Sequence, residues 1–205
     1  VVGPDALAHP TKMAALKPGR YWVQAVLDRD LGGVSFAASP GNVHSTARPL
    51  DLDPATAGPV DLRLDRVYRE PPFPEAANVK LFEIESKLLT TFHGRPTKLR
   101  AGVVLPPSWV KEPDRNYPVV YEVPGFGGNH TAAALRAAQK QWAVDGVEVL
   151  WVVLDPECRL GHHVFADSAN NGPCGRALVD ELVPALEAKF RGAGPAKRLV
   201  TGHSS

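Results

Sequence analysis

The stretch "KRLVTGHSS" spans residues 197–205 and decides the fold of the second part of this chain. Leu199 and Val200 form a short apolar run, and Gly202-His203-Ser204-Ser205 follows it directly. An apolar run of this length predicts a strand, and a glycine followed by small polar residues predicts a sharp turn. We therefore expect a strand at residues 197–201 that ends in a tight turn carrying Ser204.

The residues before this stretch alternate between strand and helix patterns. Apolar runs predict strands at 78–89, 98–106, 117–123 and 147–154, and the last of these is expected to be buried on both faces. Helical patterns occupy 131–143 and 172–190. Strands that alternate with helices predict the α/β class, with a mostly parallel, doubly wound sheet.

The two predicted helices have clear signals at their ends and on one face. In the first, we expect Thr131 as the N-cap. Its buried face is predicted to hold Leu135, Ala138 and Trp142. In the second, an apolar residue recurs every four positions at Leu178, Leu182, Leu186 and Phe190. Pro173 suits the first turn of that helix, and Pro184 is expected to kink it.

The first part of the chain shows β-strand patterns only. Residues 20–28 and 61–67 alternate between apolar and polar side chains, and turn clusters separate them. Short strands with frequent turns predict a small sandwich-like β-domain. The proline-rich segment 69–75 favours an extended connector. We therefore expect a β-domain over residues 1–75 and an α/β-domain over residues 76–205.

The composition does not point to a nucleic acid or a membrane as partner. The chain has 205 residues, of which 44% are hydrophobic and 22% charged, and its net charge is +1. This balance gives no electrostatic reason to expect a nucleic acid or a membrane surface as partner. The longest apolar stretch, 147–154, is far shorter than the ~20 residues of a membrane span. The oligomeric state is not predicted.

Ser204 sits in a pattern that carries known chemistry. Gly202 and Ser204 fill the first two fixed positions of Gly-x-Ser-x-Gly, in which a serine on a strand-to-helix turn presents its hydroxyl above a sheet. A glycine-rich loop, "EVPGFGGNH" at 122–130, follows an earlier buried strand. An oxyanion hole takes one backbone N–H from such a loop and one from the residue after the nucleophile, and these are Phe126 and Ser205.

Phosphate binding is the alternative interpretation of the glycine-rich loop. A phosphate loop would contain Gly-Lys-Ser/Thr or Gly-x-Gly-x-x-Gly, and residues 122–130 contain neither pattern. We expect no cofactor.

Three blocks together carry a family resemblance: "YPVVYEVPGFGGNH", "FADSANNGPCGRALVDELVPALEAKF" and "RLVTGHSS". They resemble the "Putative esterase" family of α/β-hydrolases, which includes esterase D-type enzymes, feruloyl and acetylxylan esterases, enterochelin esterases and mycolyltransferases. The resemblance covers roughly residues 80 to 205. An added N-terminal β-domain is similar to the arrangement in enterochelin esterase-like members.

The resemblance implies a serine esterase acting on a small-molecule or carbohydrate-linked ester. Ser204 would be the nucleophile, with the amides of Phe126 and Ser205 as the oxyanion hole. In this fold the acid and the histidine follow the serine in chain order, so we expect both beyond residue 205. Residues 76–205 would then be the N-terminal portion of the hydrolase domain, and this piece alone is expected to be inactive. An acyltransferase, a peptidase, or a non-catalytic carbohydrate- or surface-binding protein remains the alternative.

The histidines within the chain are not expected to serve as the triad base. His203 is expected to point into neighbouring packing, and His162 and His163 lie on a loop that precedes the serine turn. His93 and His130 are expected on loops near the sheet, where His130 is a candidate for lining the pocket.

The segment "PECRLGHH" at 156–163 also contains Cys158, His162 and His163, which are types of zinc ligand. Because adjacent histidines on an extended segment point apart, we favour a loop over the mouth of the site and no metal.

The polar cluster at 167–171 is expected to cap the helix at 172–190 and hold its loop, with substrate contact as the alternative. Its members are Asp167, Ser168, Asn170 and Asn171.

Two cysteines bear on the compartment. A bridge between Cys158 and Cys174 would suit an exported protein, and two free thiols a cytosolic one. The start of the sequence, "VVGPDALAHP", shows no signal-peptide pattern. Of the two locations we favour a secreted or periplasmic one over the cytoplasm.

Overall fold

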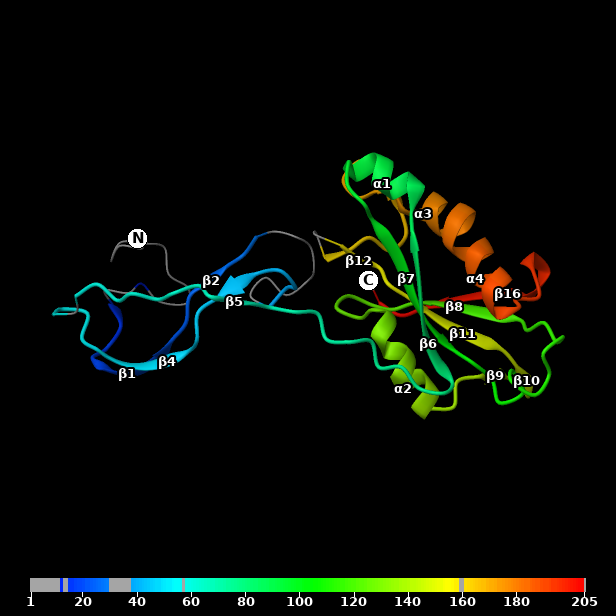
Figure 1. Cartoon of the computed structure of the whole chain (residues 1–205), viewed down its shortest axis with the longest axis horizontal. Helices are drawn as coiled ribbons and strands as arrows, with labels where there is room; N and C mark the ends of the chain where they lie inside the picture. The colour runs from blue at the N-terminus through cyan, green and yellow to red at the C-terminus, as the bar shows by residue number, and fades with distance from the viewer. Residues whose placement is uncertain (1–11, 13–14, 30–37, 57, 159–160, 205) are drawn as a thin grey trace. The chain divides into compact units, whose positions relative to one another are not determined.

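A computed structural model describes residues 12, 15–29, 38–56, 58–158 and 161–204 (Figure 1). These residues belong to two compact units, and the division between them falls at Glu70 and Pro71.

The N-terminal unit contains two small antiparallel sheets among its described residues. Strand β1 (Gly19–Val23) pairs with β4 (Arg48–Leu52). Strand β3 (Val43–His44) lies between β2 (Val26–Leu27) and β5 (Arg66–Val67). The sandwich-like packing of these sheets stays a prediction.

Two of the strands predicted in this unit are shorter than expected. Residues 20–28 divide between β1 and β2, because the backbone of Ala25 leaves the first ladder and bonds Ser45, and the Gln24 side chain donates to the Ser45 carbonyl. The Ala25 N–H donates to the Ser45 hydroxyl at 3.0 Å. Of the strand predicted at 61–67, only β5 forms.

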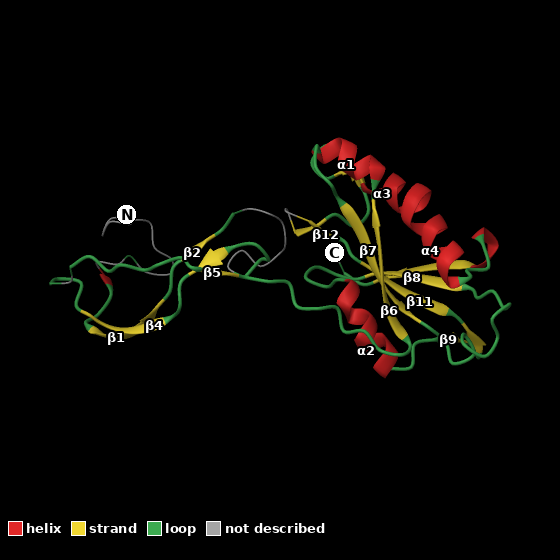
Figure 2. Ribbon diagram, in the orientation of Figure 1, coloured by secondary structure: helices red, strands yellow, loops and turns green. Residues whose placement is uncertain are grey.

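The C-terminal unit is built on a five-stranded sheet in the order β16-β8-β11-β7-β6 (Figure 2). Its strands are β6 (Val79–Glu85), β7 (Lys98–Val104), β8 (Val119–Val123), β11 (Leu150–Leu154) and β16 (Arg198–Gly202).

The sheet is mixed, so the prediction of a mostly parallel sheet is wrong for half of it. Strand β8 is parallel to both β11 and β16, whereas β7 is antiparallel to β11 and to β6. Helix α1 (Lys87–His93) connects β6 to its neighbour β7, so the chain re-enters the sheet in the opposite direction. The connections from β8 to β11 and from β11 to β16 contain helices that cover a face of the sheet. Each connection returns the chain to the sheet edge at which the previous strand began, which gives parallel pairing.

Helices cover both faces of this sheet, as the doubly wound prediction requires (Figure 1). Helices α1, α3 (Cys174–Ala177) and α4 (Val183–Phe190) lie on one side, and α2 (Ala133–Ala138) lies on the other. Strand β11 is buried between them. Its Leu150, Val152 and Leu154 join the larger core cluster, and Trp151 and Val153 join the smaller one.

The remaining elements are short. They are η2 (His130–Ala132), β9 (Ala143–Val144), β10 (Val147–Glu148), β12 (Glu157–Cys158), β13 (Gly161–His162), β14 (Asp167–Ser168), β15 (Gly172–Pro173), η3 (Leu178–Leu182) and η4 (Pro195–Lys197). No helix among the described residues has the length and apolar character needed to cross a bilayer.

The strand predicted at 78–89 ends early because a helix cap interrupts it. The Ser86 hydroxyl accepts the N–H of Leu89 at 3.1 Å and donates to the Glu181 carboxylate. Gly94 ends α1 in the left-handed conformation, with φ of 64°. The preference of Ser86 for the N-cap position therefore outweighs the strand preference of the apolar residues around it.

The first predicted helix begins with the short turn η2 at His130 and ends already at Ala138, so it is shorter than expected. Asn129, not Thr131, is the cap, since its side-chain oxygen accepts the Thr131 N–H at 3.0 Å. Leu135 is 55% exposed, and Ala133 is buried in its place. The cause is a close approach to the sheet: an ideal Cβ on Gly102 would lie 2.5 Å from the Ala133 Cβ.

The second predicted helix is interrupted before Pro184. The Val183 N–H bonds the Leu178 carbonyl across a wide π-turn formed by η3, and a regular helix resumes in α4. Proline offers no N–H and would clash in a regular turn, so the wide turn accommodates it. Pro173 lies in β15 and precedes the helix, so its predicted place in the first turn is wrong.

A buried ion pair holds α2 against β8. The Glu122 carboxylate accepts hydrogen bonds from Arg136 Nε at 2.8 Å and from the Trp151 indole at 2.6 Å. Burial raises the pKa of Glu122, but the hydrogen bonds from Arg136 and Trp151 and the Arg136 charge outweigh it, and the pKa is lowered. The pair therefore stabilises the fold above the ordinary pKa of glutamate, and this contribution is lost as the pH falls through the lowered pKa.

Replacing Glu122 should destabilise the C-terminal unit. Glu122→Gln leaves the Arg136 guanidinium without its counter-charge, and we expect a loss of about 3 kcal/mol in the free energy of unfolding. Denaturant unfolding measures it. The matched control is Glu83→Gln, which removes the exposed pair with Lys98 and should change stability by less than about 0.5 kcal/mol. Equal effects of the two substitutions would contradict the prediction.

Candidate active site

The structure places Ser204 directly after the end of β16, at the same sheet edge as the end of β8. Gly202 of β16 pairs with Val123 of β8 in parallel register, so both strands finish side by side. Ser204 has φ of 60°, in the left-handed region. A non-glycine residue in this region is uncommon and marks a sharp turn or a strained site. The predicted strand and tight turn are therefore present, with the strand at 198–202.

The glycine-rich loop that leaves β8 is in contact with this serine turn. An ideal Cβ on Gly125 would lie 2.5 Å from the His203 carbonyl oxygen and 2.9 Å from the Ser204 Cβ. No side chain fits at position 125 without displacing one of the two segments, because distances this short do not occur between real atoms of this kind. Two loops from separate strands are thus brought into van der Waals contact.

The Phe126 amide has no hydrogen-bond acceptor among the described residues. Within the part of the chain that the structure describes, its N–H donates no hydrogen bond, whereas the neighbouring Gly128 N–H closes a turn onto the Gly125 carbonyl at 2.9 Å. The Phe126 side chain is 65% exposed. Ser205, the other predicted donor, lies outside the described residues.

A hairpin formed by β12 and β13 lies beside the glycine-rich loop. His162 Nε2 lies 2.7 Å from the Pro124 carbonyl oxygen, which accepts only, so this nitrogen donates. The Asn129 side chain donates to the Glu157 carboxylate at 3.3 Å. The predicted loop near the mouth of the site is therefore a short hairpin in contact with residues 124–129.

His163 is buried and neutral. Its Nδ1 accepts the Phe165 N–H at 3.0 Å, and its ring meets the Phe165 ring edge to face. Burial and the neighbouring His162 lower the pKa of His163 to about 4, with Asp155 acting in the opposite sense. A residue so placed is a structural histidine and not a triad base.

The other histidines are also placed away from such a role. His130 is buried under Phe73, with Nδ1 2.9 Å from the Asp155 carboxylate in a contact that is not an aligned hydrogen bond, so it does not line an open pocket as expected. His93 is exposed at the end of α1. His203 is exposed, so the prediction that it packs inward is wrong.

The polar cluster at 167–171 holds the loop before α3, as predicted. The Asp167 carboxylate accepts the N–H groups of Gly175 at 2.7 Å and Arg176 at 3.1 Å. Ser168 accepts the Asn171 N–H at 3.0 Å.

The candidate zinc ligands do not converge. Cys158 and Cys174 are not joined by a disulfide. Burial, followed by the charges of Cys158 and Asp167, raises the pKa of Cys174 to about 11. Among the described residues, no three cysteine, histidine or acidic side chains gather in a way that would hold a metal ion.

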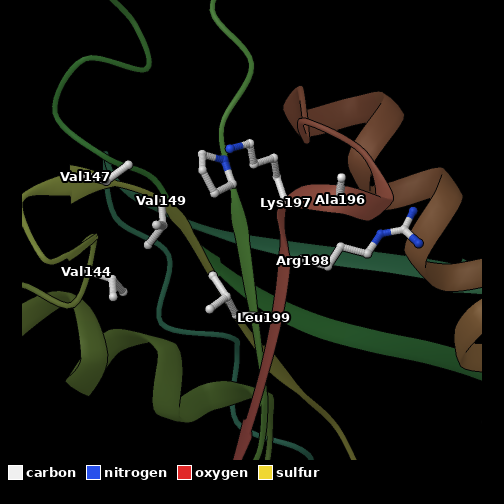
Figure 3. Close-up of a pocket in the computed structure, with 8 residues that line it drawn as sticks. Val144, Val147, Val149, Ala196, Lys197, Arg198 and Leu199 are labelled. Atoms are coloured by element: carbon white, nitrogen blue, oxygen red, sulfur yellow. The ribbon is translucent and has the colours of Figure 1, made fainter.

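A pocket of about 290 Å³ lies at the opposite end of β8 and β16 from Ser204 (Figure 3). Its lining is mostly aliphatic and includes Pro118, Val149 and Leu199. It contains neither the serine nor the glycine-rich loop. We place the candidate site at the other sheet edge, because ligands of open α/β sheets bind outside the carboxyl ends of the strands.

A central sheet with helices on both faces and a strained serine at a strand end define an α/β-hydrolase-like fold. The family model described as "Putative esterase" matches residues 94–205, which is more than half of the chain. The chain therefore belongs to this family, as the sequence resemblance predicts. No curated protein matches the chain.

Solved structures show the same likeness. A ferulic acid esterase aligns with a TM-score of 0.50 and 22% identity, over 60% of this chain and 48% of its own. An S-formylglutathione hydrolase from Agrobacterium tumefaciens aligns with 0.46 and 17%, over 63% and 51%. The ferulic acid esterase AmCE1/Fae1A from Anaeromyces mucronatus aligns with 0.41 and 17%, over 62% and 48%. The chain spans about half the length of these proteins.

Lowering the pH should reduce the free energy of unfolding, because His163 binds a proton more weakly in the folded state. The unfolded histidine binds a proton near pH 6.5 and the folded one only near pH 4, so stability falls as the pH is lowered through this interval. We expect a loss of about 3 kcal/mol, measured by denaturant unfolding across the interval.

His163→Asn tests the assignment. Asparagine retains an acceptor for the Phe165 N–H but cannot titrate, so the slope of stability with pH between 6.5 and 4 should flatten. The exposed control His93→Asn should keep the wild-type slope. An unchanged slope in His163→Asn would refute the assignment.

Proposed function

We propose that this chain carries the nucleophile and one oxyanion donor of a serine esterase. The single observation that carries the proposal is the contact of the Ser204 turn with Gly125. It sets a strained serine beside a loop whose Phe126 N–H bonds none of the described residues. Membership of the "Putative esterase" family supports the same activity.

The chemistry follows from this juxtaposition. The Ser204 hydroxyl oxygen attacks the carbonyl carbon of an ester, and its proton passes to a histidine. The carbonyl oxygen becomes negatively charged, and the N–H groups of Phe126 and Ser205 stabilise it. One such donor contributes about 3 kcal/mol to transition-state stabilisation. The alcohol leaves with the proton, and water then releases the acyl group from the serine.

The histidine and its acidic partner are proposed to follow residue 205, because chain order in this fold places both after the serine. Of the histidines described above, His130 and His163 are buried and both ring nitrogens of His162 are bonded to the backbone, which supports this assignment. A chain limited to residues 1–205 would then lack a base, and hydrolysis by it would be lower by several orders of magnitude.

The substrate class is proposed from chemistry and likeness together. Phe126 exposes an aromatic ring next to the proposed oxyanion donor. Ferulic acid esterases share the fold, so an ester of an aromatic acid, attached to a small alcohol or a carbohydrate, is the first substrate to test.

Ser204 should be the residue that reacts. We expect a fluorophosphonate to label the full-length protein at Ser204, as located by peptide mass spectrometry, and heat-denatured protein to remain unlabelled. Ser204→Ala should reduce ester hydrolysis by roughly 10⁵-fold, because the alanine removes the attacking oxygen. The proposal is ruled out if Ser204→Ala keeps the wild-type rate of ester hydrolysis, or if folded, active protein treated with the fluorophosphonate carries no adduct on Ser204.

Gly125 should be required for activity because of its contact with the serine turn. Gly125→Ala pushes the two loops apart, and a displacement near 1 Å at such a site costs about 100-fold in kcat/KM. Gly58→Ala is the control, since a Cβ there meets nothing within 4 Å. Steady-state kinetics of the two variants decide the matter. Equal kcat/KM values would show that the contact is not needed.

A further inference from the structure

The β12–β13 hairpin touches the glycine-rich loop at three places. His162 Nε2–H donates to the Pro124 carbonyl at 2.7 Å. The Phe126 ring lies over Gly161, where an ideal Cβ would come within 2.5 Å of its Cε2 atom. The Asn129 side chain bonds Glu157 at 3.3 Å. The start, middle and end of the loop are each fixed from the same hairpin.

The His162 ring is itself held in one orientation. Its Nδ1 accepts the N–H of Val164 at 3.1 Å, and the Nδ1 of His163 accepts the N–H of Phe165 in the same way. Val164 and Phe165 have φ values of 45° and 52°, a conformation that a β-branched residue rarely adopts. Each ring therefore holds its own tight turn, and the proton of His162 is confined to Nε2, which points at Pro124.

The bond to Pro124 controls the direction of the next amides. The Pro124 carbonyl belongs to the peptide plane that begins Gly125, and glycine has no side chain to restrict its rotation. Without an outside contact, the Phe126 N–H would sample several directions. The His162 bond fixes the plane on one side of Gly125, and the Phe126 ring over Gly161 fixes the other side.

We propose that His162 is a positioning residue, which aims the Phe126 N–H at the developing oxyanion by holding the Pro124 carbonyl. This inference rests on the proposed esterase function. It assigns His162 no proton transfer, because both ring nitrogens are already engaged by the backbone. Catalytic donors of this kind must be held within about 0.5 Å of their working position to be effective.

Three substitutions at position 162 in the full-length protein separate this role from others. His162→Gln places a side-chain N–H at the distance of Nε2 and can still donate to Pro124. His162→Asn keeps an acceptor for Val164 but is too short to reach Pro124. His162→Ala does neither. The exposed His93→Ala serves as the matched histidine control.

The readout is kcat and KM for p-nitrophenyl acetate. For His162→Asn and His162→Ala we expect kcat to fall about 10- to 100-fold with KM within twofold of wild type, since the donor acts on the transition state. His162→Gln should recover at least a third of wild-type kcat. Because glutamine cannot act as a base, this rescue also excludes a proton-transfer role.

Failure of the positioning role and failure of the esterase function give different results. Wild-type kcat in all three variants, with Ser204→Ala inactive, overturns the positioning role and leaves the esterase function standing. Loss of kcat in His162→Gln equal to that in His162→Ala also overturns it. An inactive wild type overturns both proposals. Nitrogen NMR of the His162 ring gives an activity-independent check: in the neutral form of the ring a proton on Nε2 is expected, and a proton on Nδ1 in that form would overturn the proposal.

Discussion

The parallel pairing of β8 with β16 is the constraint on which the rest of the site depends. It brings two chain segments, far apart in sequence, to the same sheet edge at Val123 and Gly202. The loop after one strand and the turn after the other then meet at Gly125, where only hydrogen fits beside Ser204. The contact between the serine turn and the glycine-rich loop follows from this pairing and from the absence of a side chain at Gly125.

Buried charges secure the same two strands from both sides of the sheet. On one face Glu122 of β8 holds Arg136 of α2, and on the other Glu187 of α4 holds Arg198 of β16 at 2.6 Å and 2.9 Å. The Tyr121 hydroxyl of β8 also donates to Glu187 at 3.0 Å, and burial together with that carboxylate raises the pKa of Tyr121. Since Glu187 bonds both β8 and β16, side-chain hydrogen bonds hold β16 to the rest of the unit in addition to its backbone hydrogen bonds with β8.

Part of the strained backbone lies in the serine turn and directly after the β12–β13 hairpin, while Lys140, Asp145 and Arg191 have positive φ elsewhere. Ser204, Val164 and Phe165 all have positive φ. Each such residue costs of order 1–3 kcal/mol and persists only where neighbouring contacts enforce it. Here the enforcing contacts are hydrogen bonds from amides to imidazole rings and the close packing at Gly125. The fold thus tolerates a less favourable backbone free energy while the direction of a few polar groups is fixed. This is the expected pattern for a site that stabilises charge.

The sequence by itself determined the α/β-hydrolase-like class, strand β11 buried on both faces, and the pairing of a glycine-rich loop with a serine turn. These depend on local periodicity and on residue types that few other turns tolerate. The helix caps at Ser86 and Asn129 had sequence signals that the apolar pattern masked. Only the tertiary structure decided the antiparallel half of the sheet, the burial of Ala133 against Gly102, and the bond from His162 to Pro124. Each of these joins residues distant in the chain, and pairings of that kind leave no periodic trace in a sequence.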